Sequence, residues 1–401
     1  MSLSTSQIFR QGIGAVLAQQ EGLARTQLEI ASGKSILTPA DDPSGAVRVI
    51  DIKEQIATAD QYLENGAFAR TELALEEGSL KAAENVLQRV RELMLQANND
   101  SQTTSTRQSL GNEVSARIDE LQAIANTRNA SGDFLFAGFQ IATQPFTRSG
   151  GSVVYNGDQG QRRIQVGPSS LIPVSDSGVD VFQLIKTGNG TFTVDNTVAN
   201  TGSGVISSAS QSGTFVKDDY TLTFTQALPT DPVTYQVVGA VSGVVAAGTY
   251  APREGISFNG VSLAVDGSPQ NGDSFTVKPS VNQDVFTTLD TIAAALQAQS
   301  TSPDANARLH NDMAEGLENI DRALGNFLRV HSNIGSRLNN LDSQIENNEN
   351  FRLRMQGALS DTEDLDFAEA ISQLNFQSFA LEAAQQVFIK VQGLSLFDFI
   401  R

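Results

Sequence analysis

Apolar side chains recur at alternating steps of three and four residues towards the end of the chain. This spacing places side chains in one stripe along a helix. No Pro interrupts the stretch, and its first Gly is Gly393. The pattern predicts a single helix of about 30 residues. Its seam is formed by Phe367, Ala370, Leu374, Gln377, Leu381, Ala384, Phe388 and Val391.

A matching stripe lies near the start of the chain, at Ile13, Val16, Gln20, Leu23, Gln27 and Ile30. Two seamed helices at opposite ends predict an antiparallel pair. Such a pair is marginally stable alone in water, so two interpretations remain open. Either the pair completes an ordinary core, or it packs between subunits. For the second case we predict an assembly interface at Ile13, Val16, Leu23, Ile30, Phe367, Leu374, Leu381, Phe388 and Val391.

Other helical stripes lie between these two helices. One long or broken helix, with Gly66 and Gly78 as candidate bend points, is predicted from residue 43 to 97, and another helix from 110 to 125. The start of the helix over 43–97 is indicated by Asp42 and Pro43, a carboxylate N-cap followed by Pro at the first helical position. Near the end of the chain, stripes predict a short helix over 285–296, a long one over 309–359, and the final helix from about residue 362.

The central part of the chain has a different pattern. The run 134–139 reads as a strand, and from there to about residue 280 short alternating runs are separated by Asn-Gly and Asp-Gly turns. We therefore predict an all-β insert of sandwich or barrel-like architecture.

The predicted fold class is mainly α with an all-β insert, a discontinuous helical rod with coiled-coil-like terminal helices. We expect three domains. Residues 1–42 and 361–401 supply the terminal helices and the connector, residues 43–144 and 281–360 form a helical bundle, and residues 145–280 form the inserted β-rich outer domain.

Composition restricts the function. The net charge is −18, which argues against nucleic acid and anionic membrane surfaces as partners. Cysteine is absent, which excludes disulfides, thiolate metal sites and cysteine nucleophiles. Residues 1–10 lack the pattern of a Sec-type signal peptide, and no apolar run is long enough to span a membrane. These features fit a cytoplasmic protein or one exported without a cleaved signal.

Candidate chemical motifs each have a simpler explanation. Residues 32–35 resemble the end of a phosphate-binding loop, but Leu28 stands where that motif needs a Gly. Asp41 and Asp42 are a candidate catalytic pair, yet helix capping explains Asp42. We expect His310 to be solvated and His331 to interrupt a packed stripe, and their spacing fits no metal site. The sequence therefore predicts no enzyme, no metal site and no cofactor.

Several short motifs lie in both helical halves, and two of them are distinctive. These are Leu37-Thr38-Pro39-Ala40-Asp41-Asp42-Pro43 and the ending Ser395-Leu396-Phe397-Asp398-Phe399-Ile400; the others occupy residues 4–8, 31–34, 87–93, 96–99, 125–128, 132–139 and 143–146. With these motifs the chain resembles the flagellin-like axial proteins of bacterial flagella. More narrowly it resembles hook-associated proteins of type 3, which join the hook to the filament. The additional Arg401 is a small departure from that family.

The resemblance implies a structural role in cell motility. The chain would leave the cell unfolded through the flagellar type III export pathway and reside in the extracellular flagellum. Copies would form a ring, meeting the hook-side junction protein at one end and flagellin at the other. A cytosolic export chaperone would cover the C-terminal helix. Residues 31–43, with Thr38, Asp41, Asp42 and Pro43, would connect the inner tube to the outer domains.

Two other functions remain open from the sequence. A filament flagellin would share the helical halves, although flagellins usually end differently. A glycan-binding surface protein would use the β insert, but the absence of Trp offers little support.

Overall fold

The computed structural model describes residues 5–298 and 302–393. The chain divides into two compact units, one formed by residues 1–65 with 343–401 and the other by residues 66–342. Helices α2 (Pro43–Ala97) and α5 (Pro303–Glu363) each contribute to both units. Within the described ranges, no helix is both long and apolar enough to cross a membrane.

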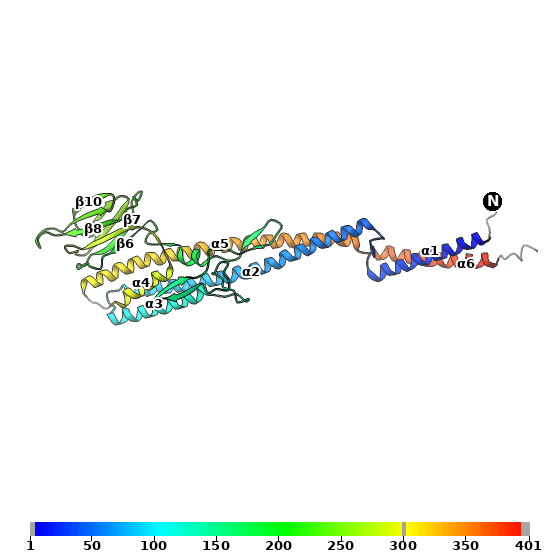
Figure 1. Ribbon diagram of the computed structural model, residues 1–401, viewed down its shortest axis with the longest axis horizontal. Coiled ribbons are helices and arrows are strands. Elements are labelled where there is room, and N and C mark those ends of the chain that lie inside the picture. Colours follow the sequence, from blue (N-terminus) through cyan, green and yellow to red (C-terminus); the bar gives the residue numbers. More distant parts are fainter. Residues whose placement is uncertain (1–4, 299–301, 394–401) are drawn as a thin grey trace, which may run out of the picture. The chain divides into compact units, whose positions relative to one another are not determined.

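In the first unit, the terminal helices α1 (Thr5–Ser32) and α6 (Phe367–Gly393) lie side by side (Figure 1). Three glycines show their direction. Gly12 of α1 faces Phe388, Gly22 faces Gln377, and Gly33, just after α1, faces Phe367. The partners descend in number as the glycines ascend, so the predicted antiparallel pair of terminal helices is confirmed. The ending motif 395–400, the first residues 1–4 and Arg401 lie outside the described residues.

The boundary between α5 and α6 differs from the prediction. The final helix was expected from about residue 362, whereas α5 continues to Glu363 and α6 begins at Phe367. The break is fixed by two features. The N–H of Leu365 donates to the carbonyl oxygen of Gly33 at 3.0 Å, and the Asp366 carboxylate accepts from the N–H groups of Ala368 and Glu369 at 2.9 and 3.2 Å. Asp366 is therefore the N-cap of α6.

The second unit is built on four helices, which include α3 (Thr104–Ala125) and α4 (Val285–Gln297) (Figure 1). Helix α2 passes through Gly66 and Gly78 as one element, so neither glycine ends it. Helices α3 and α4 pack closely because Gly111 has no side chain: a Cβ there would lie 3.1 Å from Cβ of Leu296. The helical core contains Leu73, Leu80, Leu87, Val90, Met94, Val114, Ile118, Leu121, Leu289, Ile292, Met313, Ile320 and Phe327, all buried.

The predicted strand over residues 134–139 is wrong. Only an isolated bridge between Arg128 and Phe134 occurs there, and turns follow. Gly132 and Gly138 adopt positive φ angles of 87° and 71°, which a regular strand does not contain. Residues 134–137 are buried in turns instead, with Phe136 fully covered, whereas Phe139 is exposed.

A group of aromatic rings attaches the first part of the insert to the helices. Phe182 lies in the short π-helix η1 (Val179–Gln183), and its ring centroid lies 5.2 to 6.1 Å from four other rings. These are the rings of Phe136, Phe146, Phe286 and Phe327. The chain also forms three two-stranded ladders: β1 (Phe146–Ser149) with β2 (Ser152–Tyr155), β3 (Arg163–Gln165) with β4 (Leu171–Pro173), and β5 (Ile185–Lys186) with β14 (Asn282–Gln283).

The rest of the insert is a sandwich of two antiparallel sheets. The first has the order β10 (Gly243–Thr249), β9 (Thr234–Gly239), β8 (Tyr220–Thr225), β13 (Ser274–Pro279) and β6 (Phe192–Asn196). The second has the order β11 (Gly255–Phe258), β12 (Val261–Asp266) and β7 (Val205–Gln211). Between them lies a buried core that includes Tyr220, Phe224 and Phe275.

The predicted fold class, mainly α with a β-rich insert, is confirmed. The sandwich occupies residues 192–279, whereas the earlier part of the insert packs on the helices. The three-domain division remains a prediction.

Candidate assembly surface

The structure brings most of the predicted assembly residues together between α1 and α6. Six of them are half-buried, namely Val16, Leu23, Ile30, Leu374, Leu381 and Phe388. Ile13 and Phe367 are exposed, with 37% and 50% of their surface accessible. Val391 belongs to α6, but its side chain lies outside the described part of the chain. Their role in assembly remains a prediction.

This helix pair lacks a core of its own. Among the described residues of α1 and α6, only Thr26 and Ala370 are buried, with 3% and 4% of their surface accessible. Fully burying a Leu or Phe side chain contributes only about 1.5–3 kcal/mol. Because the seam residues are half-covered, the pair leaves much of its apolar surface in water.

A second apolar stripe lies on α6 outside the seam. Phe376 and Phe379 are each 71% exposed and Val387 is 60% exposed, with Ala383 between them in sequence. Steps of three and four residues place these side chains on one face of the helix. Ile371 and Ile389 are exposed as well, and α1 exposes Leu17 and Leu28. This stripe lies outside the seam predicted from the sequence, although its spacing repeats that of the seam.

Gln377 is the polar member of the seam. Its side-chain oxygen is buried and has no hydrogen-bond partner among the described residues. Gln19, Gln373 and Phe376 line a shallow depression beside it. A buried amide oxygen without a partner costs about 1–3 kcal/mol, so this point of the helix pair is only weakly stabilised within one chain.

The two helix interruptions of the first unit, after α1 and before α6, lie next to each other. Gly33 ends α1 with a φ of +71°, and Lys34 forms an antiparallel bridge with Asp364. The N–H of Ser35 donates to the carbonyl oxygen of Glu363 at 2.8 Å. Backbone hydrogen bonds therefore join the segment after α1 to the segment before α6.

Glu363 stands at the centre of this junction. Its carboxylate accepts from the ammonium groups of Lys34 and Lys53 at 2.6 and 2.9 Å, and 8% of its surface is accessible. The hydrogen bonds from Lys34 and Lys53 lower the pKa of Glu363. Lys34, which belongs to the candidate phosphate-binding loop, thus binds a carboxylate of its own chain.

The two connector aspartates are structural. Asp41 accepts from the N–H and hydroxyl of Thr38 at 2.8 and 3.0 Å and pairs with Arg25 at 3.2 Å; the Thr38 N–H is the main cause of its lowered pKa. Asp42 accepts from the N–H of Ser44 at 3.1 Å. The predicted N-cap at Asp42, followed by Pro43 as the first residue of α2, is confirmed. The connector role itself remains a prediction.

The second unit contains a buried charged cluster that sequence reasoning did not find. Asp176 accepts two hydrogen bonds from Arg337 at 2.8 and 2.9 Å, and its N–H donates to Glu76 at 2.9 Å. Arg162 pairs with Glu72 at 3.3 Å. The three carboxylates are 1–4% exposed. The cluster joins α2, α5 and the root of the insert, residues far apart in sequence, so periodicity could not reveal it.

The two histidines also have specific partners. His310 was expected to be solvated; its side chain is only partly exposed, with Nδ1 2.6 Å from Oδ1 of Asn98 and Nε2 3.0 Å from Oδ1 of Asp100. His331 lies 3.1 Å from Glu77 and 3.4 Å from Glu84, which accounts for a polar residue in a packed stripe. In the described ranges, no group of three or more His, Asp or Glu side chains is arranged to hold a metal ion.

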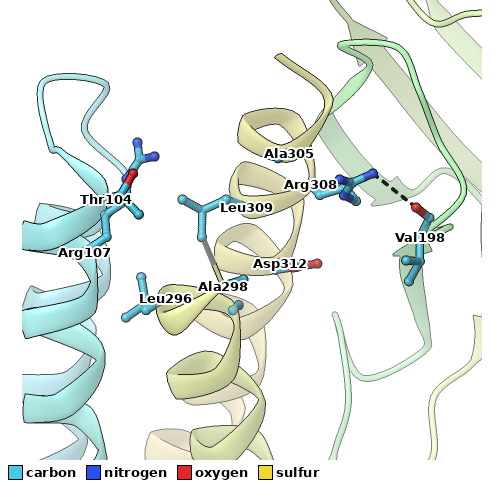
Figure 2. A pocket seen from close by; sticks show the side chains of 10 residues that line it. Thr104, Arg107, Val198, Leu296, Ala298, Ala305, Arg308, Leu309 and Asp312 are labelled. Atoms are coloured by element: carbon cyan, nitrogen blue, oxygen red, sulfur yellow. Dashed lines mark hydrogen bonds between the residues drawn. The ribbon is translucent and has the colours of Figure 1, made fainter. Parts of the chain in front are cut away.

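A cavity of about 240 Å³ lies between α3, α4, α5 and the loop of Val198, and Figure 2 shows the side chains that line it. Apolar side chains such as Leu296 and Leu309 line it. Two arginines also line the cavity. The Arg308 guanidinium donates to the carbonyl oxygens of Val198 and Asn200 at 3.1 and 2.9 Å. The Arg107 guanidinium donates to the carbonyl oxygen of Ala97 and to the side-chain oxygen of Asn306. Both arginines therefore hold the loop and helix ends of their own chain.

The chain is similar in sequence to known proteins of the bacterial flagellum. Residues 6–140 match the bacterial flagellin N-terminal helical region, and residues 317–400 match the C-terminal helical region. Flagellar hook-associated protein 3 from Escherichia coli is 25% identical over 398 residues, which cover 99% of each chain. Flagellin B from Vibrio cholerae is 29% identical over 150 residues, covering 37% of this chain and 35% of that one.

Solved structures agree with the full-length similarity. The crystal structure of the flagellar junction protein FlgL from Legionella pneumophila aligns with a TM-score of 0.72 and 34% identity. The alignment covers 79% of this chain and 100% of that chain.

Proposed function

Because the chain belongs to the family of flagellar hook-associated protein 3, a structural component of the bacterial flagellum, we propose that copies of it assemble through α1 and α6. The sequence-based prediction of a junction protein is confirmed by the family. The observation that supports assembly through these helices is the apolar stripe of Phe376, Phe379 and Val387 on α6. Contiguous exposed apolar surface marks sites of protein association.

The two apolar faces have different tasks in this proposal. The half-buried seam of Leu374, Leu381 and Phe388 holds α6 against α1 within one copy. The exposed stripe then packs against the terminal helices of neighbouring copies, which completes the core that one pair lacks. The resulting closed assembly is a ring with the helix pairs inside.

We infer the partners of the ring from the family to which the chain belongs. One end of the ring meets the hook-side junction protein, and the other end meets flagellin. Before assembly, a cytosolic chaperone covers the apolar stripe of α6, since such a surface invites aggregation in water. The chain leaves the cell by the flagellar type III pathway and works in the extracellular flagellum. It acts as a structural protein and not as an enzyme.

The test uses a strain from which the gene is deleted. We expect cells with hooks but no filaments, and flagellin monomer shed into the medium. Wild-type chain should restore filaments, whereas the double variant Phe376→Ser with Phe379→Ser should not. Phe139→Ser, which changes an exposed Phe of the second unit, is the matched control and should restore them. Normal filaments in the deletion strain would contradict the junction role, and normal filaments with the double variant would contradict the assembly surface.

A further inference from the structure

The sandwich has four edge strands, β10 and β6 in the five-stranded sheet and β11 and β7 in the three-stranded sheet. Two of them, β10 and β7, are the longest. Each is seven residues long. The outer edge of a strand offers backbone N–H and C=O groups that another strand can pair with.

These edges lack the charges that usually protect such strands. No charged residue occurs between Asp231 and Arg253, a stretch that contains β9 and β10, or between Asp195 and Lys217, which contains β7. Natural sheets commonly protect an edge with charge, Pro, a bulge or a covering element. Of these, both strands have a bulge, β10 between Val244 and Ala246 and β7 between Ile206 and Ser208, which leaves residues 246–249 and 208–211 in regular pairing geometry.

The other two edges are less suited to pairing. Strand β11 has four residues and directly follows Arg253 and Glu254. Strand β6 contains Asp195, and its Asn196 bonds to Asp312 of α5 at 2.8 Å. The start of β7 is also held by α5, because the N–H of Ile206 donates to Asn311. Its remaining residues, 207–211, are mostly exposed.

The two uncharged edges lie on opposite sides of the sandwich. Strand β10 is on the side of β11, to which it is joined by the corner at Tyr250. Strand β7 is on the side of β6, where the Thr191 hydroxyl donates to the side chain of Gln211 at 3.0 Å. A single sandwich thus carries one edge on each side.

We propose that β10 of one copy pairs with β7 of a second copy, head to tail. The occupant is another copy because the proposed assembly through α1 and α6 already places copies beside one another. Each chain carries a net charge of −18, so neighbouring copies meet with least repulsion at their uncharged stretches. A head-to-tail contact closes into a ring when its rotation allows. The inference rests on the proposed assembly of the terminal helices and adds a second, outer contact between the same neighbours.

Disulfide cross-linking tests the pairing, since the chain contains no Cys and every disulfide must involve introduced thiols. The double variant Ser208→Cys with Ala247→Cys places one thiol on each edge, at two exposed positions. The deletion strain is complemented with this chain or with either single variant, and isolated hooks are oxidised. We expect a ladder of covalent oligomers from the double variant and only monomers from each single variant.

Each other result has a defined meaning. Protein present on hooks without a ladder would overturn the strand pairing and leave the proposed function standing. Covalent dimers from Ala247→Cys alone would also overturn it, because they would show that β10 pairs with β10. Wild-type chain absent from hooks would overturn the proposed function and, with it, the inference.

Discussion

Phe388 of α6 packs directly over Gly12 of α1. A Cβ at Gly12 would lie 3.1 Å from Cδ2 of Phe388, whereas a Cβ at Gly14 would have no heavy atom within 4 Å. Replacing either Gly by Gln removes a helix-weakening residue, worth about 0.5–1 kcal/mol. We expect Gly14→Gln to raise the thermal stability of the helix pair and Gly12→Gln to lower it, because Phe388 must move. Helical circular dichroism of the full chain during heating measures both. Equal effects of the two variants would contradict the packing.

The ion pairs of Glu363 predict that the first unit loses stability at acid pH. The pKa of Glu363 is lowered in the folded chain, so its stabilisation is present above the unfolded pKa and is lost as the pH falls through the folded pKa. Glu363→Gln should remove this acid dependence and destabilise the first unit by about 1 kcal/mol, a modest value because both Lys side chains are half exposed. Thermal unfolding between neutral and acid pH measures the effect. Glu382→Gln, at an exposed position of α6, is the control and should change little.

The buried charged cluster predicts that the free energy of unfolding falls at alkaline pH. Burial, and next the charge of Asp176, raise the pKa of Glu76 to about 8. A neutral Glu76 leaves two carboxylates, Glu72 and Asp176, opposite two guanidinium groups, Arg162 and Arg337. The folded chain keeps a proton that the unfolded chain releases, so the free energy of unfolding falls as the pH rises from about 4.5 towards 8, by at most about 1.4 kcal/mol per pH unit.

Glu76→Gln tests this directly. The amide imitates the neutral acid, so we expect near-normal stability at pH 6 and a smaller loss between pH 6 and pH 9 than in the wild type, measured by urea unfolding. Glu254→Gln, at an exposed position of the sandwich, should keep the wild-type pH dependence. A Glu76→Gln chain as sensitive to alkali as the wild type would show that another group titrates.

The aromatic group around Phe182 predicts how firmly the root of the insert is held. Phe182→Ala removes the ring that contacts four others and should lower the free energy of unfolding by about 3–5 kcal/mol. Amide hydrogen exchange should rise over residues 134–186. Phe139→Ala, at a residue that is 64% exposed, should have a much smaller effect. Unchanged exchange in the Phe182→Ala chain would mean that other contacts hold this segment.

Local patterns predicted the helices because periodicity reports which face of an element is covered. The stripe of Leu374, Leu381 and Phe388 identified α6, and Asp42 with Pro43 identified the start of α2. Run 134–139 was misread because an apolar run looks the same in a strand and in a buried turn, and only Gly132 and Gly138, with their positive φ angles, separate the two.

Contacts between distant residues could not be predicted in this way. The bonds of Glu363 to Lys34 and Lys53, and of Asp176 to Glu76 and Arg337, join residues from separate parts of the chain. The stripe of Phe376 and Phe379 had the same spacing as the seam, but which stripe faces α1 depends on the rotation of α6 about its axis, which one sequence does not determine.

The pairing of α1 with α6 also has a consequence for the order of folding. Residues 33–366 separate the two helices, and closing so long a loop in an unfolded chain costs about 5 kcal/mol of entropy. The second unit, residues 66–342, lies wholly within this loop, and its collapse shortens the distance that remains to be closed. We therefore expect α1, which is synthesised first, to pair with α6 last, after the middle of the chain has folded.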